Sequence, residues 1–125
     1  MYEVEIISNF SAAHRLRNYH GKCEHLHGHN YRVHVTARAS SLGDGGMVID
    51  FGDLRKAANR AVEPFDHSYL NEIKPFDRIE PSAENIAAFL FEEIGRQLND
   101  KAEMLYSVSV WESDGSRATF VKETN

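Results

Sequence analysis

Two segments near the start of the chain alternate apolar and polar residues, which is typical of β-strands with one buried face. In residues 2–13 the apolar side chains fall on even positions, and in residues 28–39 they fall on odd positions. These positions are Val4, Ile6, Phe10 and Ala12 in the first segment and Tyr31, Val33, Val35, Ala37 and Ala39 in the second. The pattern predicts two strands of an antiparallel sheet.

Two later segments carry apolar residues at helical spacing. The first follows Asp50, a typical N-cap residue, and ends at Pro64, which cannot continue a helix. The second follows Ser82, another N-cap residue. The apolar positions that mark the first helix are Phe51, Leu54, Ala58, Ala61 and Val62, and a core-facing row in the second consists of Ile86, Leu90, Ile94 and Leu98. We therefore predict two amphipathic helices.

The last part of the chain predicts a hairpin of two strands, at residues 105–112 and 117–122, joined by a turn at 113–116. Tyr106, Val108 and Val110 share one parity, and Glu112 continues it, which places a carboxylate at the end of an apolar row. The order strand, strand, helix, helix, strand, strand predicts one α+β domain over residues 1–125. Its two helices should cover the apolar face of a four-stranded antiparallel sheet.

Three histidines continue the apolar parities of the first two strands. His14 follows the even positions, and His27 and His29 precede the odd ones. Residues two apart in a strand point to the same face, so His27 and His29 can bind one metal ion from a rigid element. Cys23 adds a thiol four residues before His27. The group predicts a metal site on the core side; the alternative is that the histidines merely occupy strand ends.

Composition and charge limit the cellular compartment and the classes of binding partner that we expect. The 125 residues are 42% hydrophobic and 26% charged, which is ordinary for a globular protein. A formal net charge of −5 argues against general nucleic-acid binding. There is no apolar run of membrane-spanning length and no signal-peptide pattern, and a single cysteine excludes an internal disulfide. We therefore expect a cytoplasmic protein with neither a nucleic-acid nor a membrane partner.

Two loops carry further polar side chains. Residues 15–26 include Arg15, Arg17 and Lys22, which either form a solvated loop or contact a phosphate. Asp66 and His67 form either a surface pair or an acid–base pair. Because adjacent residues do not easily orient one another, the Asp66–His67 pair alone is weak evidence for acid–base catalysis.

Six motifs in order make the chain recognisable. They are SAAH at 11–14, CEHLHGHNY at 23–31, GMVIDF at 46–51, DH at 66–67, SAEN at 82–85 and WE at 111–112. Over essentially its whole length the chain resembles the 6-pyruvoyl-tetrahydropterin synthase superfamily, and within it the bacterial 6-carboxy-tetrahydropterin synthases (QueD). The resemblance implies the tunnelling fold (T-fold), in which subunits join edge to edge into trimeric β-barrels that stack into hexamers. It also implies active sites between subunits.

The resemblance also implies roles for individual residues. His14, His27 and His29 would bind zinc and leave a fourth position open, as in catalytic zinc sites. Cys23 would be the general base, with Asp66 and His67 as proton-relay partners from the same or a neighbouring subunit. The substrate-binding set would comprise Glu84, Glu112 and Ser82, with Glu112 also assisting the relay. Glu84 and Ser82 have structural alternatives, as a dipole partner and as the cap of the second helix.

The reaction implied is conversion of 7,8-dihydroneopterin triphosphate to 6-carboxy-5,6,7,8-tetrahydropterin, acetaldehyde and triphosphate, a step of queuosine biosynthesis. Three residues separate Cys23 from His27, whereas the animal pyruvoyl enzymes have a longer insert. Glu24 departs from the pattern, because a folate-pathway subgroup uses a glutamate near this position in place of the cysteine. A dual enzyme could therefore use Glu24 to release 6-hydroxymethyl-7,8-dihydropterin. The alternative is a solvated loop residue.

Two other classes of protein remain open on the sequence. Three histidines with a free position could form a zinc hydrolase that activates water, which would not need Cys23. The domain could also be a pterin- or purine-binding module without catalysis, although the full set of Cys23, Asp66, His67 and the histidine ligands argues against that reading.

Overall fold

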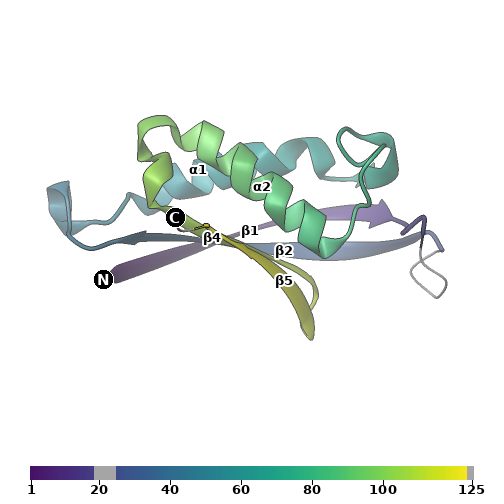
Figure 1. Cartoon of the computed structure of the whole chain (residues 1–125), viewed down its shortest axis with the longest axis horizontal. Helices are drawn as coiled ribbons and strands as arrows, with labels where there is room; N and C mark the ends of the chain where they lie inside the picture. Colours follow the sequence, from purple (N-terminus) through teal and green to yellow (C-terminus); the bar gives the residue numbers. More distant parts are fainter. Residues whose placement is uncertain (19–24, 124–125) are drawn as a thin grey trace.

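A computed structural model describes residues 1–18 and 25–123 of the chain. The strands and helices are β1 (Tyr2–His14), β2 (His27–Ala39), α1 (Phe51–Val62), β3 (Ser68–Tyr69), α2 (Ala83–Leu98), β4 (Leu105–Ser113) and β5 (Ser116–Val121). Short 3-10 helices occupy Asp44–Gly46, Glu63–Phe65, Leu70–Glu72 and Asn99–Met104. Both α-helices lie side by side on one face of the sheet (Figure 1). The predicted α+β class is confirmed.

The sheet has five strands in the order β3-β1-β2-β4-β5. The four long strands are antiparallel, as predicted, but the expected number of four is wrong. The extra strand β3 has two residues and pairs in parallel with β1 at Ala12 and Ala13. A two-residue strand has no room for an alternating pattern, so its sequence looks like a loop.

Strands β1 and β2 pair over all 13 residues of each strand. Phe10 lies opposite Tyr31, and their rings stack with centroids 4.7 Å apart. At the end of the ladder His14 lies opposite His27. The alternation of buried and exposed residues therefore continues without a shift to the last pair of these strands, and the histidines lie on the same face as the buried apolar residues.

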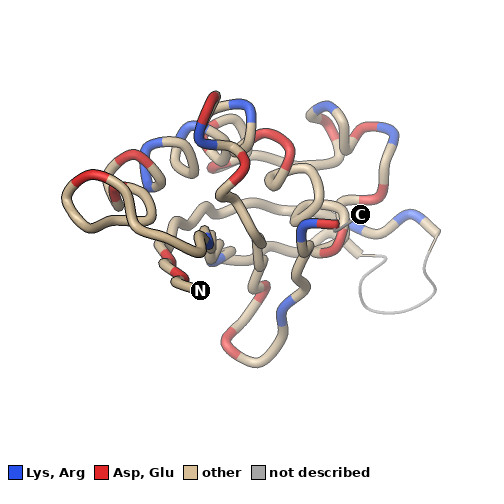
Figure 2. The backbone as a smooth tube through the Cα atoms, turned by 60° about the vertical axis from the view of Figure 1, so that its left-hand side comes forward, with Lys and Arg blue, Asp and Glu red and all other residues tan. Residues whose placement is uncertain are grey.

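The two helices begin at the predicted caps. A side-chain oxygen of Asp50 accepts a hydrogen bond from the amide of Gly52, at 2.6 Å, and the Ser82 hydroxyl accepts one from the amide of Asn85, at 3.2 Å. Acidic and basic residues are interspersed over the helical layer (Figure 2). Within residues 1–18 and 25–123, no helix is long and apolar enough to cross a membrane.

The prediction that Tyr106 shares the face of Val108 and Val110 is wrong, because β4 contains a β-bulge. The register against β2 shifts between Thr36 and Ala37, so that Leu105, not Tyr106, enters the core. The Tyr106 ring lies instead on the helix-free face, under the Arg38 guanidinium at 3.5 Å. A bulge adds one residue to one strand, so the residues of β4 on the N-terminal side of the bulge point to the opposite face from the one that alternation predicts. Beyond the bulge, Val108 and Val110 are buried as predicted.

Candidate metal centre

Three imidazoles converge at the end of the β1–β2 hairpin. One ring nitrogen from each of His14, His27 and His29 lies within 4.8 Å of the others. His14 is buried, whereas His27 and His29 are half-buried. The alternation of the strands produces this cluster, because His14 and His27 form the last pair and His29 lies opposite Ala12.

The hydrogen bonds of the two paired histidines define which ring nitrogen carries the proton. Nδ1 of His14 is 2.7 Å from the carbonyl oxygen of Pro81, and Nδ1 of His27 is 2.7 Å from that of His25. A carbonyl oxygen can only accept, so each Nδ1 must donate. In the neutral rings both Nε2 atoms are then left with a free lone pair. Backbone carbonyls orient metal-binding histidines in this way.

The free lone pairs face one another. The Nε2 atoms of His14 and His27 are 3.0 Å apart, and Nε2 of His29 is buried with no hydrogen-bond partner in the described part of the chain. Two acceptors at this distance repel each other unless a cation lies between them. Nitrogens bound to one tetrahedral metal ion at about 2.0–2.1 Å stand about 3.3 Å apart. The three residues therefore fit a divalent cation that accepts imidazole ligands.

Glu112, at the end of β4, lies beside the cluster. Its carboxylate oxygens are 3.6 Å from Nε2 of His29 and 4.0 Å from Nε2 of His14. Burial lowers the pKa of both His14 and His29, although the Glu112 charge acts in the opposite direction. Neutral imidazole is the form that binds metals, so burial favours the binding form.

Asp66 and His67 form an ordered pair next to β1. The Asp66 carboxylate accepts a hydrogen bond from the amide of Ser11 at 2.9 Å and lies 3.1 Å from Nδ1 of His67. The amide of His67 donates in turn to the carbonyl of Ser11 at 2.6 Å. The expectation that adjacent residues would not orient one another is wrong, because His67 has a left-handed backbone (φ 57°) that turns its ring toward Asp66. The Ser11 amide lowers the pKa of Asp66 and keeps it ionised.

One residue of the Asp66–His67 pair and one of the three clustered histidines border the same hollow. His67 and His29 both line a space of about 360 Å³ beside the end of β1. The other lining residues are Ser11, Ala12, Ala13, Gly28, Asn30 and Ser68. The fold thus brings together residues from three separate motifs. Cys23 and Glu24, which the sequence places in the same site, lie outside the described residues.

The N-terminus of α2 reaches the cluster through its backbone. Ser82 caps the helix, and Glu84 is exposed in the first turn without a hydrogen bond or ion pair to any residue in the described ranges. The contact with His14 is made by the carbonyl of Pro81. Sequence reasoning missed Pro81, because a backbone carbonyl is common to every residue type and leaves no side-chain signal.

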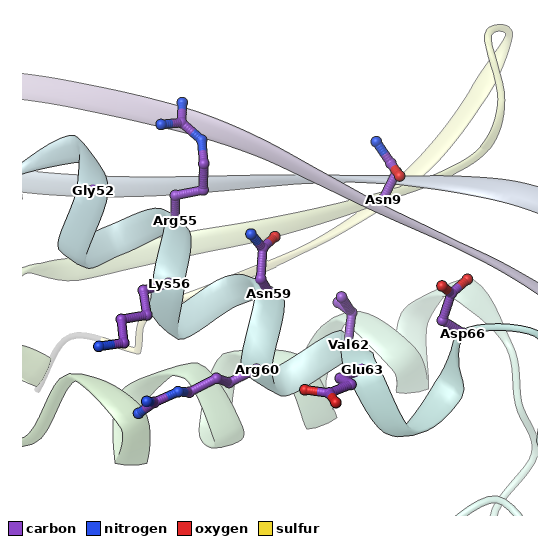
Figure 3. Close-up of a pocket in the computed structure, with 9 residues that line it drawn as sticks. All are labelled: Asn9, Gly52, Arg55, Lys56, Asn59, Arg60, Val62, Glu63 and Asp66. Carbon is purple, nitrogen blue, oxygen red and sulfur yellow. The ribbon is translucent and has the colours of Figure 1, made fainter.

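Another hollow, of about 500 Å³, runs along α1 and does not include the histidines. Figure 3 shows the basic side chains Arg55, Lys56 and Arg60 that line it, with Asp66 at one end. Asp66 lines this hollow, whereas its neighbour His67 lines the one beside the histidines. Apart from Asp66, no predicted site residue in the described part of the chain lines the hollow along α1.

Comparisons with known proteins agree on one family. The sequence profile of the family described as 6-pyruvoyl tetrahydropterin synthase matches residues 3–123. A putative 6-carboxy-5,6,7,8-tetrahydropterin synthase of Archaeoglobus fulgidus is 40% identical over 95 residues, which cover 75% of this chain and 76% of the relative. The 6-carboxy-5,6,7,8-tetrahydropterin synthase of Synechocystis is 36% identical over 90% of this chain and 87% of the relative.

Human 6-pyruvoyl tetrahydrobiopterin synthase is 31% identical, over 92% of this chain and 88% of its own. Among solved structures, 6-pyruvoyl tetrahydropterin synthase of Caenorhabditis elegans superposes with a TM-score of 0.89 at 28% identity. That match covers 98% of this chain and 96% of the other. The relatives thus include both carboxy- and pyruvoyl-forming enzymes.

Proposed function

This chain belongs to the 6-pyruvoyl tetrahydropterin synthase family, and from that premise we propose that it is a zinc-dependent 6-carboxy-5,6,7,8-tetrahydropterin synthase. Its substrate would be 7,8-dihydroneopterin triphosphate, and its products 6-carboxy-5,6,7,8-tetrahydropterin, acetaldehyde and triphosphate. The observation that carries the proposal is the cluster of three imidazoles, in which one ring nitrogen of each histidine lies within 4.8 Å of the others. The carboxy-forming relatives and the three-residue spacing between Cys23 and His27 support this product over the pyruvoyl one.

The metal ligands would be His14, His27 and His29. When bound, a zinc ion supplies Lewis-acid polarisation of the side-chain oxygens of the substrate, and three protein ligands leave room for such oxygens. The chain contributes neutral imidazoles held by the carbonyls of Pro81 and His25. Two of the three ligands, His14 and His27, are therefore oriented before any metal binds, which favours tight binding.

Proton transfer would use Cys23, Asp66 and His67. A thiol near cationic groups titrates closer to neutrality, which suits Cys23 as the base that removes a substrate proton. With Asp66 ionised and Nδ1 of His67 donating to it, Nε2 of His67 keeps its lone pair for a proton. The side chain of His67 is 83% exposed, so it can exchange that proton with solvent or with a group of another subunit.

Binding of the pterin ring would use carboxylates. A pterin edge presents ring N–H and amino donors, which carboxylate oxygens match with charge-assisted hydrogen bonds. Glu112 is 29% exposed beside the histidines and is the first candidate for this contact, with Glu84 and Ser82 at the start of α2 as further members of the substrate-binding set. We place the working enzyme in a homo-oligomer, a hexamer made of two trimers, with Asp66 and His67 acting on a neighbouring site.

Product analysis tests this proposal. Zinc-loaded wild type, Cys23→Ala and Glu24→Ala are each given dihydroneopterin triphosphate and, separately, dihydroneopterin, and the products are identified by mass spectrometry. We expect Cys23→Ala to lose 6-carboxy-tetrahydropterin while keeping its zinc. A Cys23→Ala variant that keeps full turnover would instead indicate a zinc hydrolase, and absence of any turnover by zinc-loaded wild type would indicate a binding module.

Glu24 supports a second activity of the same site, because it places a carboxylate directly beside Cys23 in the sequence. In a dual enzyme, Glu24→Ala should lose mainly 6-hydroxymethyl-7,8-dihydropterin. Equal loss of both products in Glu24→Ala would contradict the dual activity. Light scattering tests the assembly in the same samples, and a stable, fully active monomer would exclude a site completed between subunits.

A further inference from the structure

Arg17 is bonded to its own chain, in contrast to the solvated or phosphate-binding role that its loop suggests. Its guanidinium donates to the carbonyl oxygens of three residues and to one carboxylate, and its amide donates to the same carboxylate. The guanidinium acceptors are Asn71 O at 3.3 Å, Phe76 O at 2.5 Å, Ile79 O at 3.4 Å and Glu80 Oε1 at 3.3 Å. Its amide bonds to Glu80 Oε2 at 2.7 Å. Arg17 thus fixes the segment that leads into α2.

Glu80 connects this network to the metal cluster. Its carbonyl accepts a hydrogen bond from Nδ2 of Asn85, at 2.9 Å, while its carboxylate is held by Arg17. The next residue is Pro81, whose carbonyl contacts His14. Two links therefore join the same pair of segments: Arg17 to Glu80, and His14 to Pro81. Arg17 lies three residues after His14, and Glu80 directly precedes Pro81.

We propose that Arg17 and Glu80 are positioning residues for the metal centre. Together they hold the Pro81 carbonyl at the place where it fixes the tautomer and the ring orientation of His14. This inference rests on the proposed function of the histidines as metal ligands. Groups that orient a metal-binding histidine typically change metal affinity about 10–100-fold when they are lost.

Arginine suits this position for a geometric reason. A guanidinium is a planar fork with five N–H donors, so one side chain can satisfy several carbonyls and a carboxylate in fixed directions. A lysine carries its donors on a single nitrogen and cannot span the same acceptors. The side chain of Arg17 is 27% exposed and that of Glu80 is 30% exposed, so the network lies at the edge of the core.

The same segment has a second anchor that does not involve Arg17. The Phe76 ring is fully buried and packs against Phe65 and Phe89, with ring centroids 5.5 and 5.7 Å apart. The amides of residues 77–79 also donate to the carbonyls of Ile73 and Pro75. Loss of the Arg17 contacts should therefore leave the segment folded as far as residue 79 and loosen only Glu80 and Pro81, where the bond from Asn85 remains. We expect a folded protein with a misplaced Pro81 carbonyl.

The experiment compares Arg17→Ala, Arg17→Lys and Glu80→Gln with wild type. Zinc affinity is measured by competition with a chromophoric chelator, and the tautomer of His14 is read in metal-free protein from ¹⁵N NMR shifts of the ring. We expect Arg17→Ala to bind zinc about 10–100-fold more weakly and to lose the single Nδ1–H form of His14. Arg17→Lys should not restore either property. Glu80→Gln keeps only one of the two acceptor oxygens that Arg17 uses, so it should weaken zinc binding less than Arg17→Ala does, and wild-type affinity in this variant would exclude Glu80 from the positioning role.

Leu54→Ala is the control for general loss of stability, because Leu54 is fully buried and belongs to α1, which contributes no residue to the Arg17 network or to the histidine cluster. It should lower the unfolding temperature but leave zinc affinity and the His14 signals unchanged. Wild-type affinity and a wild-type His14 spectrum in Arg17→Ala would overturn the inference, as would an equal loss of affinity in Leu54→Ala. If wild type itself binds no zinc, the proposed function fails, while the tautomer in Arg17→Ala still decides the positioning role.

Discussion

Replacing His27 by alanine tests the metal centre with little disturbance of the core, because His27 is half-buried and lies at the end of its strand. A ligand that binds only the folded state at 100 times its Kd stabilises a protein by about 2.7 kcal/mol. For a chain of 125 residues, 1 kcal/mol corresponds to about 4 °C in Tm. Zinc at that excess should therefore raise the Tm of wild type by about 10 °C.

His27→Ala should change the two states in different directions. With zinc, most of the 10 °C rise should disappear, because two imidazoles bind more weakly than three. Without metal, the variant should unfold at the wild-type temperature or slightly above it, because the 3.0 Å contact between two lone pairs is removed. A destabilised fold would lower the Tm in both states, so the pair of measurements separates a lost ligand from a damaged core.

The assay is thermal unfolding followed by circular dichroism after treatment with a chelator, with and without added zinc. His34→Ala is the matched control, since His34 lies on the helix-free face of the sheet, 3.2 Å from Glu5, and its loss should leave the zinc-dependent rise intact. A full zinc-dependent rise in His27→Ala would refute the assignment of His27 as a ligand. An equal loss in His34→Ala would show that zinc stabilises the protein at another place.

Three further results are expected. Leu90→Ala should reduce the free energy of unfolding by about 2–5 kcal/mol in urea titrations, because Leu90 is fully buried; a loss below 1 kcal/mol would contradict its place in the core. Ser82→Ala should cost about 1 kcal/mol through the lost cap, and zinc affinity should not change; a large drop in affinity would show a second role. The pKa of Asp66 is lowered in the folded state, so its stabilisation is present above the unfolded pKa and is lost as the pH falls through the folded one. Asp66→Asn should therefore flatten the acid limb of Tm against pH, and an unchanged limb would contradict the Ser11–Asp66 bond.

The long elements were predictable because periodicity is a property of many residues at once. The parity of β1 extends from Val4 to His14, so a single misplaced residue such as Ser8 does not obscure it. The helix starts were predictable because Asp50 and Ser82 act on amides two or three residues away. The same parity also predicted that His14 lies on the core face, and the prediction of the metal cluster depends mainly on that position.

Contacts that depend on one residue or on the backbone were not predictable. Tyr106 changes face because of one bulge in β4, and β3 is too short to show a period. Asp66 and His67 become partners through one left-handed backbone angle. The Pro81 carbonyl contacts His14, which is 67 residues away in the sequence, and no side-chain pattern predicts such a contact.

The terminal pair of the β1–β2 ladder gives the metal centre a mechanical consequence. His14 and His27 occupy the last rung, where a ribbon of two strands ordinarily frays. An ion shared by both strands would close that rung like a cross-link, and chelation would let the ribbon open from this end. Amide hydrogen exchange at His14 and His27 should then quicken first when zinc is removed, while Ile6 and Val35, which form a pair in the middle of the same ladder, keep their protection.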